Sequence, residues 1–395
     1  MTVEIVQDLE GFVGLRNDWE RVHELDPEAG YFLSWRWFAQ VFRSNPGRWK
    51  VLAIRGGGPG KEYTCFLPLS HHTHWSESGQ RFKTELKPAG KLAWAQYTGF
   101  VCDPAVEEEA IGEVAAYLSA TPWARISFKH DGCRRRLEFL LRAFSDPQSY
   151  RVSFRSMLIN DGSVDNLVCP RLSLPDDFDT YVQSQLSSKT RQKMRRFWRR
   201  YERSEDLRIV DSTSDTFASD LDALLEMWLV RWMPERGEKS ALRVAAKYRE
   251  FLDLSNRIGA IRLSTLWEGE RRLGAICCIV DQDEKYLYFI VSGRDESASE
   301  PNIGLLLHTD AIKWAIGNGM RTYDFCHGNE AYKISYGAAE HVLSNVEIVR
   351  RSACDVSQLD PCRVGDAMRK TIDMIEGNRI GAASSACRQL LPLIA

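Results

Sequence analysis

The chain has 395 residues, a formal net charge of −2 at pH 7, 44% hydrophobic and 27% charged residues. This length predicts two domains, because a single hydrophobic core does not usually grow so large. The near balance of charge excludes a global field that recruits nucleic acid or membrane, so such an attraction would have to be local. No uninterrupted run of about 18 apolar residues occurs, and the first ten residues lack the basic and apolar regions of a signal peptide. We therefore expect a cytoplasmic protein without a membrane span.

Cysteine and histidine usage argues against a metal site. None of the ten cysteines forms a Cys-x-x-Cys pair, and several lie in apolar runs, which predicts reduced and mostly buried thiols. In the run His71-His72-Thr73-His74, only His72 and His74 would share a face of an extended chain, and no nearby acid or cysteine completes a ligand set. We expect this run at a surface turn and expect no metal cofactor.

The first 160 residues predict a mixed α/β unit. Ser34 is a candidate N-cap of an aromatic-rich helix, and the Gly-Gly-Gly-Pro-Gly run at 56–60 predicts a hairpin turn. Strands are expected at 2–7, 50–55, 63–71, 97–102, 124–129 and 151–159, and helices at 11–25, 31–42, 107–119 and 134–144.

A turn-rich stretch at 160–166 is the candidate boundary, after which a similar order of elements begins again. Three short runs joined by tight charged turns can pair only as antiparallel neighbours. Strands are expected at 167–174, 207–211, 260–267, 272–280, 285–292, 321–326 and 341–350, and helices at 178–202, 217–233, 241–258 and 303–316. We therefore expect units at 1–160 and 161–365, followed by a helical tail at 366–395.

The stretch 189–203, at the end of the helix expected at 178–202, is strongly basic, with eight Lys or Arg and one acid, Glu202. Four apolar residues form a stripe at helical spacing: Met194, Phe197, Trp198 and Tyr201. Three arginines follow one another on another face: Arg191, Arg195 and Arg199. A solvated basic face, an anionic partner and a membrane surface all fit this pattern. Packing of the stripe into a core would explain it without a membrane.

The segment 323–336, Tyr-Asp-Phe-Cys-His-Gly-Asn-Glu-Ala-Tyr-Lys-Ile-Ser-Tyr, concentrates polar groups. Acyl transfer to an amine needs a base, an acid for the leaving group, and a group that stabilises developing charge. Asp324 and Glu330 are the candidate bases, and Tyr332 or Tyr336 the candidate acid. Lys333 would neutralise charge or grip a phosphate. The alternative is a structural turn in which Lys333 pairs with Asp324 or Glu330.

The order of elements, with the runs at 186–196, 301–307, 311–319 and 323–333, resembles the N-acyltransferase (GNAT) fold. The resemblance is to the cellulose-biosynthesis-type acetyltransferases, relatives of the FemAB peptidyltransferases, and it implies two GNAT-like units in tandem. It matches the family's Asp, Gly and Tyr-Lys positions to Asp324, Gly328, Tyr332 and Lys333.

The resemblance also implies a coenzyme A site. In that family the loop after the three-stranded meander binds the pyrophosphate, at a helix start whose free N–H groups suit a phosphate. The usual Arg-x-x-Gly-x-Gly form is reduced here to one glycine. The expected cofactor-binding residues are Arg294, Asn302, Ile303, Gly304 and Leu305. The residues expected to contact the acceptor are His327, Arg191 and Arg195.

The resulting expectation is an acyltransferase that moves an acyl group, in the first place acetyl, from a CoA thioester to an amine. The acceptor would be a sugar or another small envelope or exopolysaccharide precursor, and the first unit would be degenerate. Direct attack in a ternary complex is preferred, because no Cys or Ser has the surroundings of an acyl-enzyme nucleophile. One rival is a FemAB-like transferase that uses aminoacyl-tRNA, with RNA held by the basic helix. Another is a non-catalytic binding module of the same fold, a reading that the missing second glycine supports.

Overall fold

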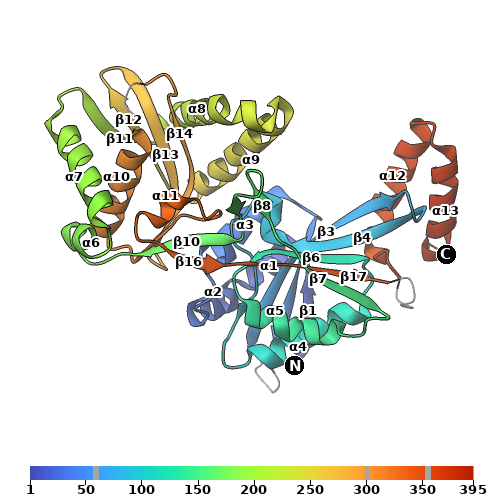
Figure 1. Ribbon diagram of the computed structural model, residues 1–395. Helices are drawn as coiled ribbons and strands as arrows, with labels where there is room; N and C mark the ends of the chain where they lie inside the picture. The colour runs from blue at the N-terminus through green and yellow to red at the C-terminus, as the bar shows by residue number, and fades with distance from the viewer. Residues whose placement is uncertain (57–61, 299–301, 352–356, 395) are drawn as a thin grey trace. The chain divides into compact units, whose positions relative to one another are not determined.

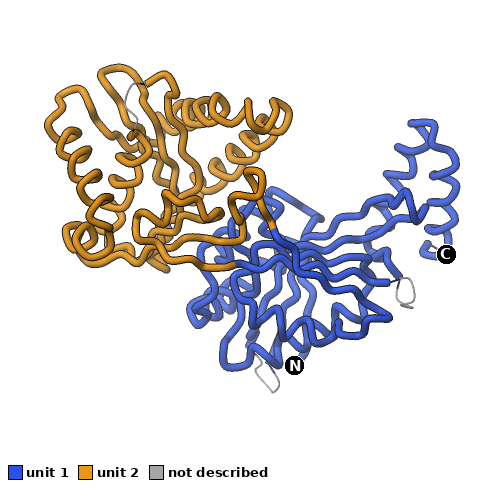
Figure 2. The backbone as a smooth tube through the Cα atoms, viewed as in Figure 1, with its two compact units in different colours: residues 1–156, 343–395 blue, residues 157–342 orange. Residues whose placement is uncertain are grey.

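The computed structural model describes residues 1–56, 62–298, 302–351 and 357–394. The chain forms two compact units (Figure 2): unit 1 comprises Met1–Ser156 and Leu343–Ala395, and unit 2 comprises Met157–Val342. The expected boundary after residue 160 lies close to this junction. Residues 343–365, expected in the second unit, instead belong to unit 1, because a strand within them pairs in its sheet. The glycine-rich turn expected at 56–60, apart from Gly56, and Pro301 lie outside the described residues.

Unit 1 is built on an eight-stranded sheet with the order β1-β2-β3-β4-β6-β17-β7, and β5 pairs with β3. Its strands are β1 (Thr2–Val6), β2 (Trp49–Arg55), β3 (Tyr63–Ser76), β4 (Arg81–Pro88), β5 (Val101–Cys102), β6 (Arg125–Asp131), β7 (Tyr150–Phe154) and β17 (Ser344–Arg350). Only the β4–β6 pair is parallel. Strand β4 was not expected, because charged residues dominate its sequence. Strand β3 continues through the three histidines, so the surface turn expected there is wrong.

The helices of unit 1 are α1 (Leu9–Gly14), α2 (Arg16–Leu25), α3 (Trp35–Ser44), α4 (Glu107–Ala120), α5 (Arg134–Leu141), α12 (Val364–Glu376) and α13 (Ile380–Ile394). Ser34 is the N-cap of α3, since its Oγ accepts the N–H of Trp37 at 3.2 Å. The helix expected at 11–25 is interrupted at Leu15. The tail expected to be helical forms α12 and α13.

Unit 2 contains a seven-stranded sheet with the order β11-β12-β13-β14-β15-β10-β16. Its strands are β10 (Val168–Ser173), β11 (Leu207–Asp211), β12 (Ile261–Glu268), β13 (Arg271–Asp281), β14 (Tyr286–Arg294), β15 (Thr322–Asp324) and β16 (Ala339–Val342). A separate hairpin joins β8 (Leu158–Ile159) and β9 (Val164–Asp165). The antiparallel meander β12-β13-β14 is confirmed. The single strand expected at 341–350 divides between β16 in unit 2 and β17 in unit 1.

Helices cover both faces of the second sheet (Figure 1), with α7 and α10 on one face and α8 and α9 on the other. The helices are α6 (Phe178–Ser184), α7 (Ser188–Arg203), α8 (Phe217–Arg236), α9 (Glu238–Arg257), α10 (Ile303–Gly317) and α11 (Ala331–Ile334). The helix expected at 178–202 divides into α6 and α7, because Ser187 caps α7. The apolar stripe of α7 packs into the core of unit 2, as expected.

Two further expectations concern thiols and membranes. Most cysteines of the described residues are buried, as expected, although Cys362 and Cys387 are exposed. Within the described ranges, none of the helices combines the length and the apolar character that a membrane crossing requires.

The two sheets follow one plan. Each has four antiparallel strands, then a parallel neighbour, then two further antiparallel strands. The crossover between the parallel strands carries α4 in unit 1 and α10 in unit 2. The sixth strand is β17 in unit 1 and β10 in unit 2. The mixed α/β fold of two similar units, which the sequence predicted, is confirmed.

Candidate active site

The two parallel strands of unit 2 separate at their carboxyl ends. Their pairing covers Tyr286–Tyr288 and Thr322–Asp324, whereas β14 continues to Arg294. Ile290 is an extra residue in β14, because Cys277 pairs with Val291 and Cys278 with Phe289 on either side of it. Such a bulge bends its strand locally. The edge of β14 beyond Tyr288 is therefore not paired with β15.

Beyond β15, the chain forms hydrogen bonds with β10, the neighbour of β15 on the side away from β14. The N–H of Phe325 donates to Pro170 O at 2.9 Å, and that of Gly328 to Val168 O at 2.8 Å. Both acceptors lie on β10, so the segment moves away from β14. In sheets of this kind, ligands bind in the crevice outside the carboxyl ends of parallel strands.

Helix α10 begins after β14, at this same end of the sheet. The N–H groups of its first turn have no acceptor within the helix, and they carry the positive end of the helix dipole. Gly304 is exposed, and a Cβ there would meet no atom within 4 Å. Ile303 is buried against Gly274, where a Cβ would lie 2.5 Å from Ile303 Cγ2. The helix start thus offers open backbone donors.

The other residues expected at this cofactor site contribute less. Asn302 is the buried N-cap residue of α10, and Leu305 is half-buried in its first turn. Arg294 is occupied by Glu296, with Nε and Nη2 donating to that carboxylate at 3.1 and 3.0 Å. A phosphate would have to compete with Glu296 for this guanidinium.

Asp324 is a fixed structural carboxylate. It is 0% exposed, and its Oδ2 accepts from Arg171 Nε at 2.9 Å while its Oδ1 accepts from the N–H of Cys326 at 2.7 Å. Arg171 lies on β10, so the ion pair joins β15 to β10. Cys326 adopts a φ of 53°, an unusual conformation for a residue other than glycine. Asp324 therefore stabilises the turn where the chain leaves the sheet.

Lys333 is likewise occupied by the turn that follows. Its side chain is 3% exposed, its Nζ donates to His327 O at 2.5 Å and to Gly328 O at 2.9 Å, and Glu330 Oε2 lies 2.9 Å away. Gly328 has a φ of 96°, and a Cβ there would lie 2.6 Å from Glu330 Oε2. This is the structural turn that the sequence left open as an alternative.

Glu330 and Tyr332 differ from these two because solvent reaches them. The Glu330 side chain is 32% exposed, and Tyr332 is 43% exposed. Local burial and the nearby Glu330 charge raise the pKa of Tyr332 well above its ordinary value. Burial raises the pKa of Tyr248 on α9 to about 12, and the charge of Glu330 adds to this effect. Sequence analysis missed Tyr248, because nothing local marks it among the residues of an amphipathic helix.

A buried histidine lies behind Tyr332. His308 on α10 is buried, and its Nδ1 lies 2.8 Å from Tyr323 Oη. Burial lowers the pKa of His308 to about 3, and the Lys333 charge acts in the same direction, so the ring is neutral. Its aromatic neighbours are Phe289, Tyr323, Phe325, Tyr332 and Tyr336. Tyr336 is buried in this group, and burial raises its pKa well above the ordinary value.

The remaining expected residues divide between two places. His327 lies in the turn, with Nδ1 3.4 Å from Cys169 Sγ. Arg191 is half-buried, and its Nη2 donates to Leu186 O at 3.2 Å. Arg195 is exposed and lines a separate pocket of about 420 Å³ with Trp198. The structure thus brings the expected residues at 324–333 together in one turn. Arg195 instead faces a separate pocket.

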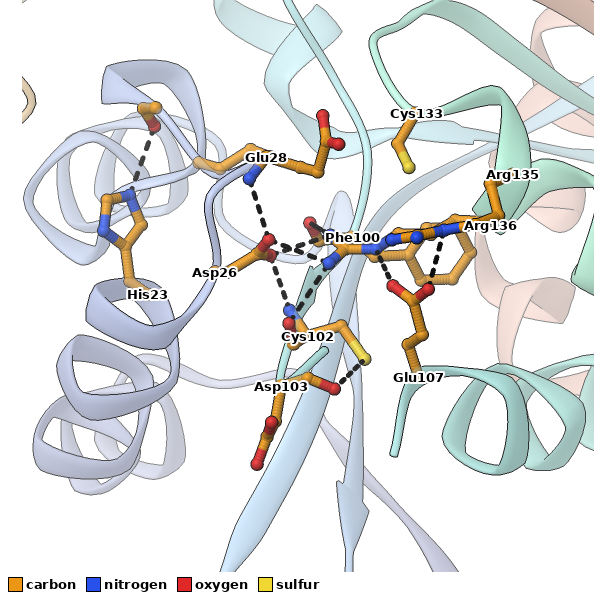
Figure 3. Close-up of polar contacts among 12 residues, drawn as sticks. His23, Asp26, Glu28, Phe100, Cys102, Asp103, Glu107, Cys133, Arg135 and Arg136 are labelled. Carbon is orange, nitrogen blue, oxygen red and sulfur yellow. Dashed lines mark hydrogen bonds and ion pairs between the residues drawn. The ribbon is translucent and has the colours of Figure 1, made fainter. Parts of the chain in front are cut away.

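The corresponding helix start of unit 1 carries acidic side chains. The first turn of α4 carries three acids, Glu107, Glu108 and Glu109. Figure 3 shows buried Arg136 held between Asp26 and Glu107. Its Nη1 and Nη2 bind Asp26 at 2.8 Å each, and its Nε binds Glu107 at 3.0 Å. Glu107 and Glu108 form ion pairs with Arg135, Arg136 and Arg142, whereas the first turn of α10 carries no acidic side chain that would oppose a phosphate.

Comparison with known proteins supports the fold. Residues 188–334, most of unit 2, match the sequence profile of a family described as "Acetyltransferase (GNAT) domain". The structure is similar to a solved structure of FemX, with a TM-score of 0.58, 12% identity, and coverage of 88% of this chain and 97% of that one. A comparison with curated protein sequences finds no match. Unit 2 therefore has a GNAT-type fold, and the likeness to FemX extends over both units.

Two further solved structures are less similar to this chain. The structure of L-PGS from Bacillus licheniformis has a TM-score of 0.45 and 12% identity over 88% of this chain and 93% of that one. A tandem GNAT protein from the clavulanic acid biosynthesis pathway has a TM-score of 0.44 and 9% identity over 88% of this chain and 98% of that one.

Proposed function

We propose that the protein is an N-acyltransferase whose acyl donor is a CoA thioester bound by unit 2. One observation carries the proposal: the parallel strands β14 and β15 diverge at the end of the sheet where α10 begins with open N–H groups. The pyrophosphate would bind the N–H groups of Ile303, Gly304 and Leu305. The amide groups of the pantetheine arm would pair with the edge of β14 from Phe289 onward, as an added strand would.

Glu330 is the preferred general base. A base must reach the proton it removes, directly or through one water. Glu330 is 32% exposed, whereas Asp324 is 0% exposed and both of its oxygens accept hydrogen bonds. Asp324 and Lys333 then act as positioning residues, since each holds the backbone that carries Glu330.

Tyr332 is the preferred partner of the leaving group. Its raised pKa keeps the hydroxyl protonated, so it donates a hydrogen bond to the departing thiolate. The amine nitrogen bonds to the carbonyl carbon, the carbon–sulfur bond breaks, and the amine proton passes to Glu330. The acceptor would be an amine on a sugar or another small envelope or exopolysaccharide precursor, as the family resemblance suggests. His327 and Arg191 would contact it.

The test combines donor binding with turnover. Acetyl-CoA is titrated by calorimetry, and thiol release is followed with a set of amino sugars. Glu330→Gln should lower kcat by about tenfold or more while leaving acetyl-CoA affinity within about twofold. Glu340→Gln, which removes an exposed carboxylate of β16, is the matched control and should be unchanged. Wild-type turnover in Glu330→Gln would exclude this assignment, and the absence of heat with acetyl-CoA would favour a binding module.

An aminoacyl-tRNA donor is the second candidate. It is supported by a pocket of about 530 Å³ on α7 lined by Arg196, Arg199, Arg200 and Arg203, because such a cluster suits a nucleic acid backbone. If aminoacyl-tRNA is the donor, tRNA should bind with an affinity that falls steeply with salt concentration. Arg199→Gln should weaken this binding. Saturable acetyl-CoA binding without tRNA binding would remove this candidate.

A further inference from the structure

Unit 1 contains a pocket that the proposed acyl transfer does not use. Its volume is about 620 Å³, and it lies between the turn at 46–48, the middle of β3 and the first turns of α12. Four cationic side chains line it, whereas Asp366 is the one carboxylate among its lining residues. The lining cations are Arg48, Arg363, Arg369 and Lys370.

Neutral backbone carbonyls hold much of this pocket in place. Arg363 Nη1 donates to Gly47 O at 2.9 Å, and His71 Nε2 lies 3.0 Å from the same oxygen. Lys370 Nζ donates to Thr73 O. These bonds fix the side chains without cancelling their charge. The single carboxylate of Asp366 forms ion pairs with both Arg363 and Arg369.

The charge that remains is positive. Nearby Asp360 lies 3.7 Å from Lys50 Nζ, so this additional acid is matched by an additional cation. Burial lowers the pKa of Arg363; the charge of Asp360 opposes this shift, and the charges of Arg369 and Arg48 reinforce it. Burial lowers the pKa of His71 to about 4, so this ring adds no charge at neutral pH. Three of the four lining cations are therefore in excess of the single acid.

Two buried polar atoms at the pocket make no hydrogen bond within the described part of the chain. Thr73 is 2% exposed and lines the pocket, and its Oγ1 makes no hydrogen bond within the described part of the chain. The same holds for Arg363 Nε. Buried donors and acceptors are nearly always satisfied, by protein, water or ligand. The pocket thus combines uncompensated charge with unmet hydrogen bonds.

We propose that this pocket binds the phosphate monoester group of a small polar ligand. Guanidinium groups match phosphate oxygens with paired hydrogen bonds. The volume falls within the range of about 300–1,000 Å³ typical of ligand sites, which leaves room for an organic part beyond the phosphate. The site lies wholly in unit 1 and is independent of the acyl-donor site.

The proposal is tested on the full chain by calorimetry with glucose 6-phosphate, using glucose as the uncharged comparison. One saturable site is expected for the phosphate ester and no heat for glucose. Arg48→Gln and Lys370→Gln should each weaken binding by about fivefold to tenfold, as expected for loss of a charge-assisted hydrogen bond. Arg388→Gln removes the same charge from exposed α13 and should stay within about twofold.

A second arm distinguishes a soluble ester from a lipid headgroup of the same chemistry. Vesicles of phosphatidylcholine with and without phosphatidic acid are sedimented with the protein, with glucose 6-phosphate as competitor. Competed binding to phosphatidic acid vesicles supports the site with a lipid source, and calorimetric binding alone supports a soluble source. Thermal unfolding checks that each variant is folded. Binding of neither ligand, or equal losses in Arg48→Gln and Arg388→Gln, would overturn the proposal.

Discussion

Replacing Lys333 with methionine separates a positioning role from direct contact with the substrate. Methionine keeps much of the side-chain length but removes the ammonium. Two charge-assisted hydrogen bonds disappear, to His327 O at 2.5 Å and Gly328 O at 2.9 Å, and each is worth about 1.5–3 kcal/mol. The ion pair with Glu330 adds at most about 1 kcal/mol, because Glu330 is partly solvated.

Part of this sum is offset, since the folded protein no longer buries a charge. We therefore expect Lys333→Met to lower the free energy of unfolding of unit 2 by about 3–5 kcal/mol. Urea unfolding followed by circular dichroism measures the loss, and turnover is measured where the variant remains folded. Lys239→Met, at an exposed position of α9, is the control and should change stability by less than about 0.5 kcal/mol. Unchanged stability with a tenfold loss of turnover would refute the reasoning and place the ammonium on the substrate.

Three further predictions test the donor site and the core. Gly304→Glu should weaken acetyl-CoA binding by about tenfold or more in calorimetry, whereas Gly317→Glu at the other end of α10 should not; equal affinities would move the phosphate elsewhere. Asp26→Asn should cost about 3–5 kcal/mol in urea unfolding, because buried Arg136 loses its main partner; a loss below about 1 kcal/mol would contradict this. Burial raises the pKa of Asp131 to about 7, whereas the unfolded carboxyl titrates near its ordinary value. Its contribution to stability should therefore be complete below about pH 4 and fall by up to about 1.4 kcal/mol per pH unit towards pH 7, a slope that Asp131→Asn should remove.

Local patterns predicted the elements that depend on local sequence. The meander and the helix after it appear within a few residues of their expected bounds. The basic stretch with its apolar stripe is helical as expected, although the helix expected at 178–202 divides into α6 and α7. Each owes its form to short turns, helical spacing or a capping residue, which can be read along the chain.

What sequence could not predict depends on pairing between distant segments. Strand β4 was missed because its charged residues gain partners only in the folded sheet, as Glu85 does with Arg125. The sequence singled out the segment 323–336, but only the folded structure shows Arg171 beside Asp324. His308 was missed because a histidine within an apolar helix resembles any other core residue until its aromatic neighbours are known.

The placement of β17 has a consequence for biosynthesis. The sheet of unit 1 needs a strand at residues 344–350, between β6 and β7, and the ribosome makes this strand only after all of unit 2. During translation the edges of β6 and β7 would remain open, and exposed edges invite pairing with other chains. Unit 2 is continuous in sequence and can begin folding first. Emergence of β17, rather than emergence of the first 156 residues, should therefore be the event that completes the sheet of unit 1.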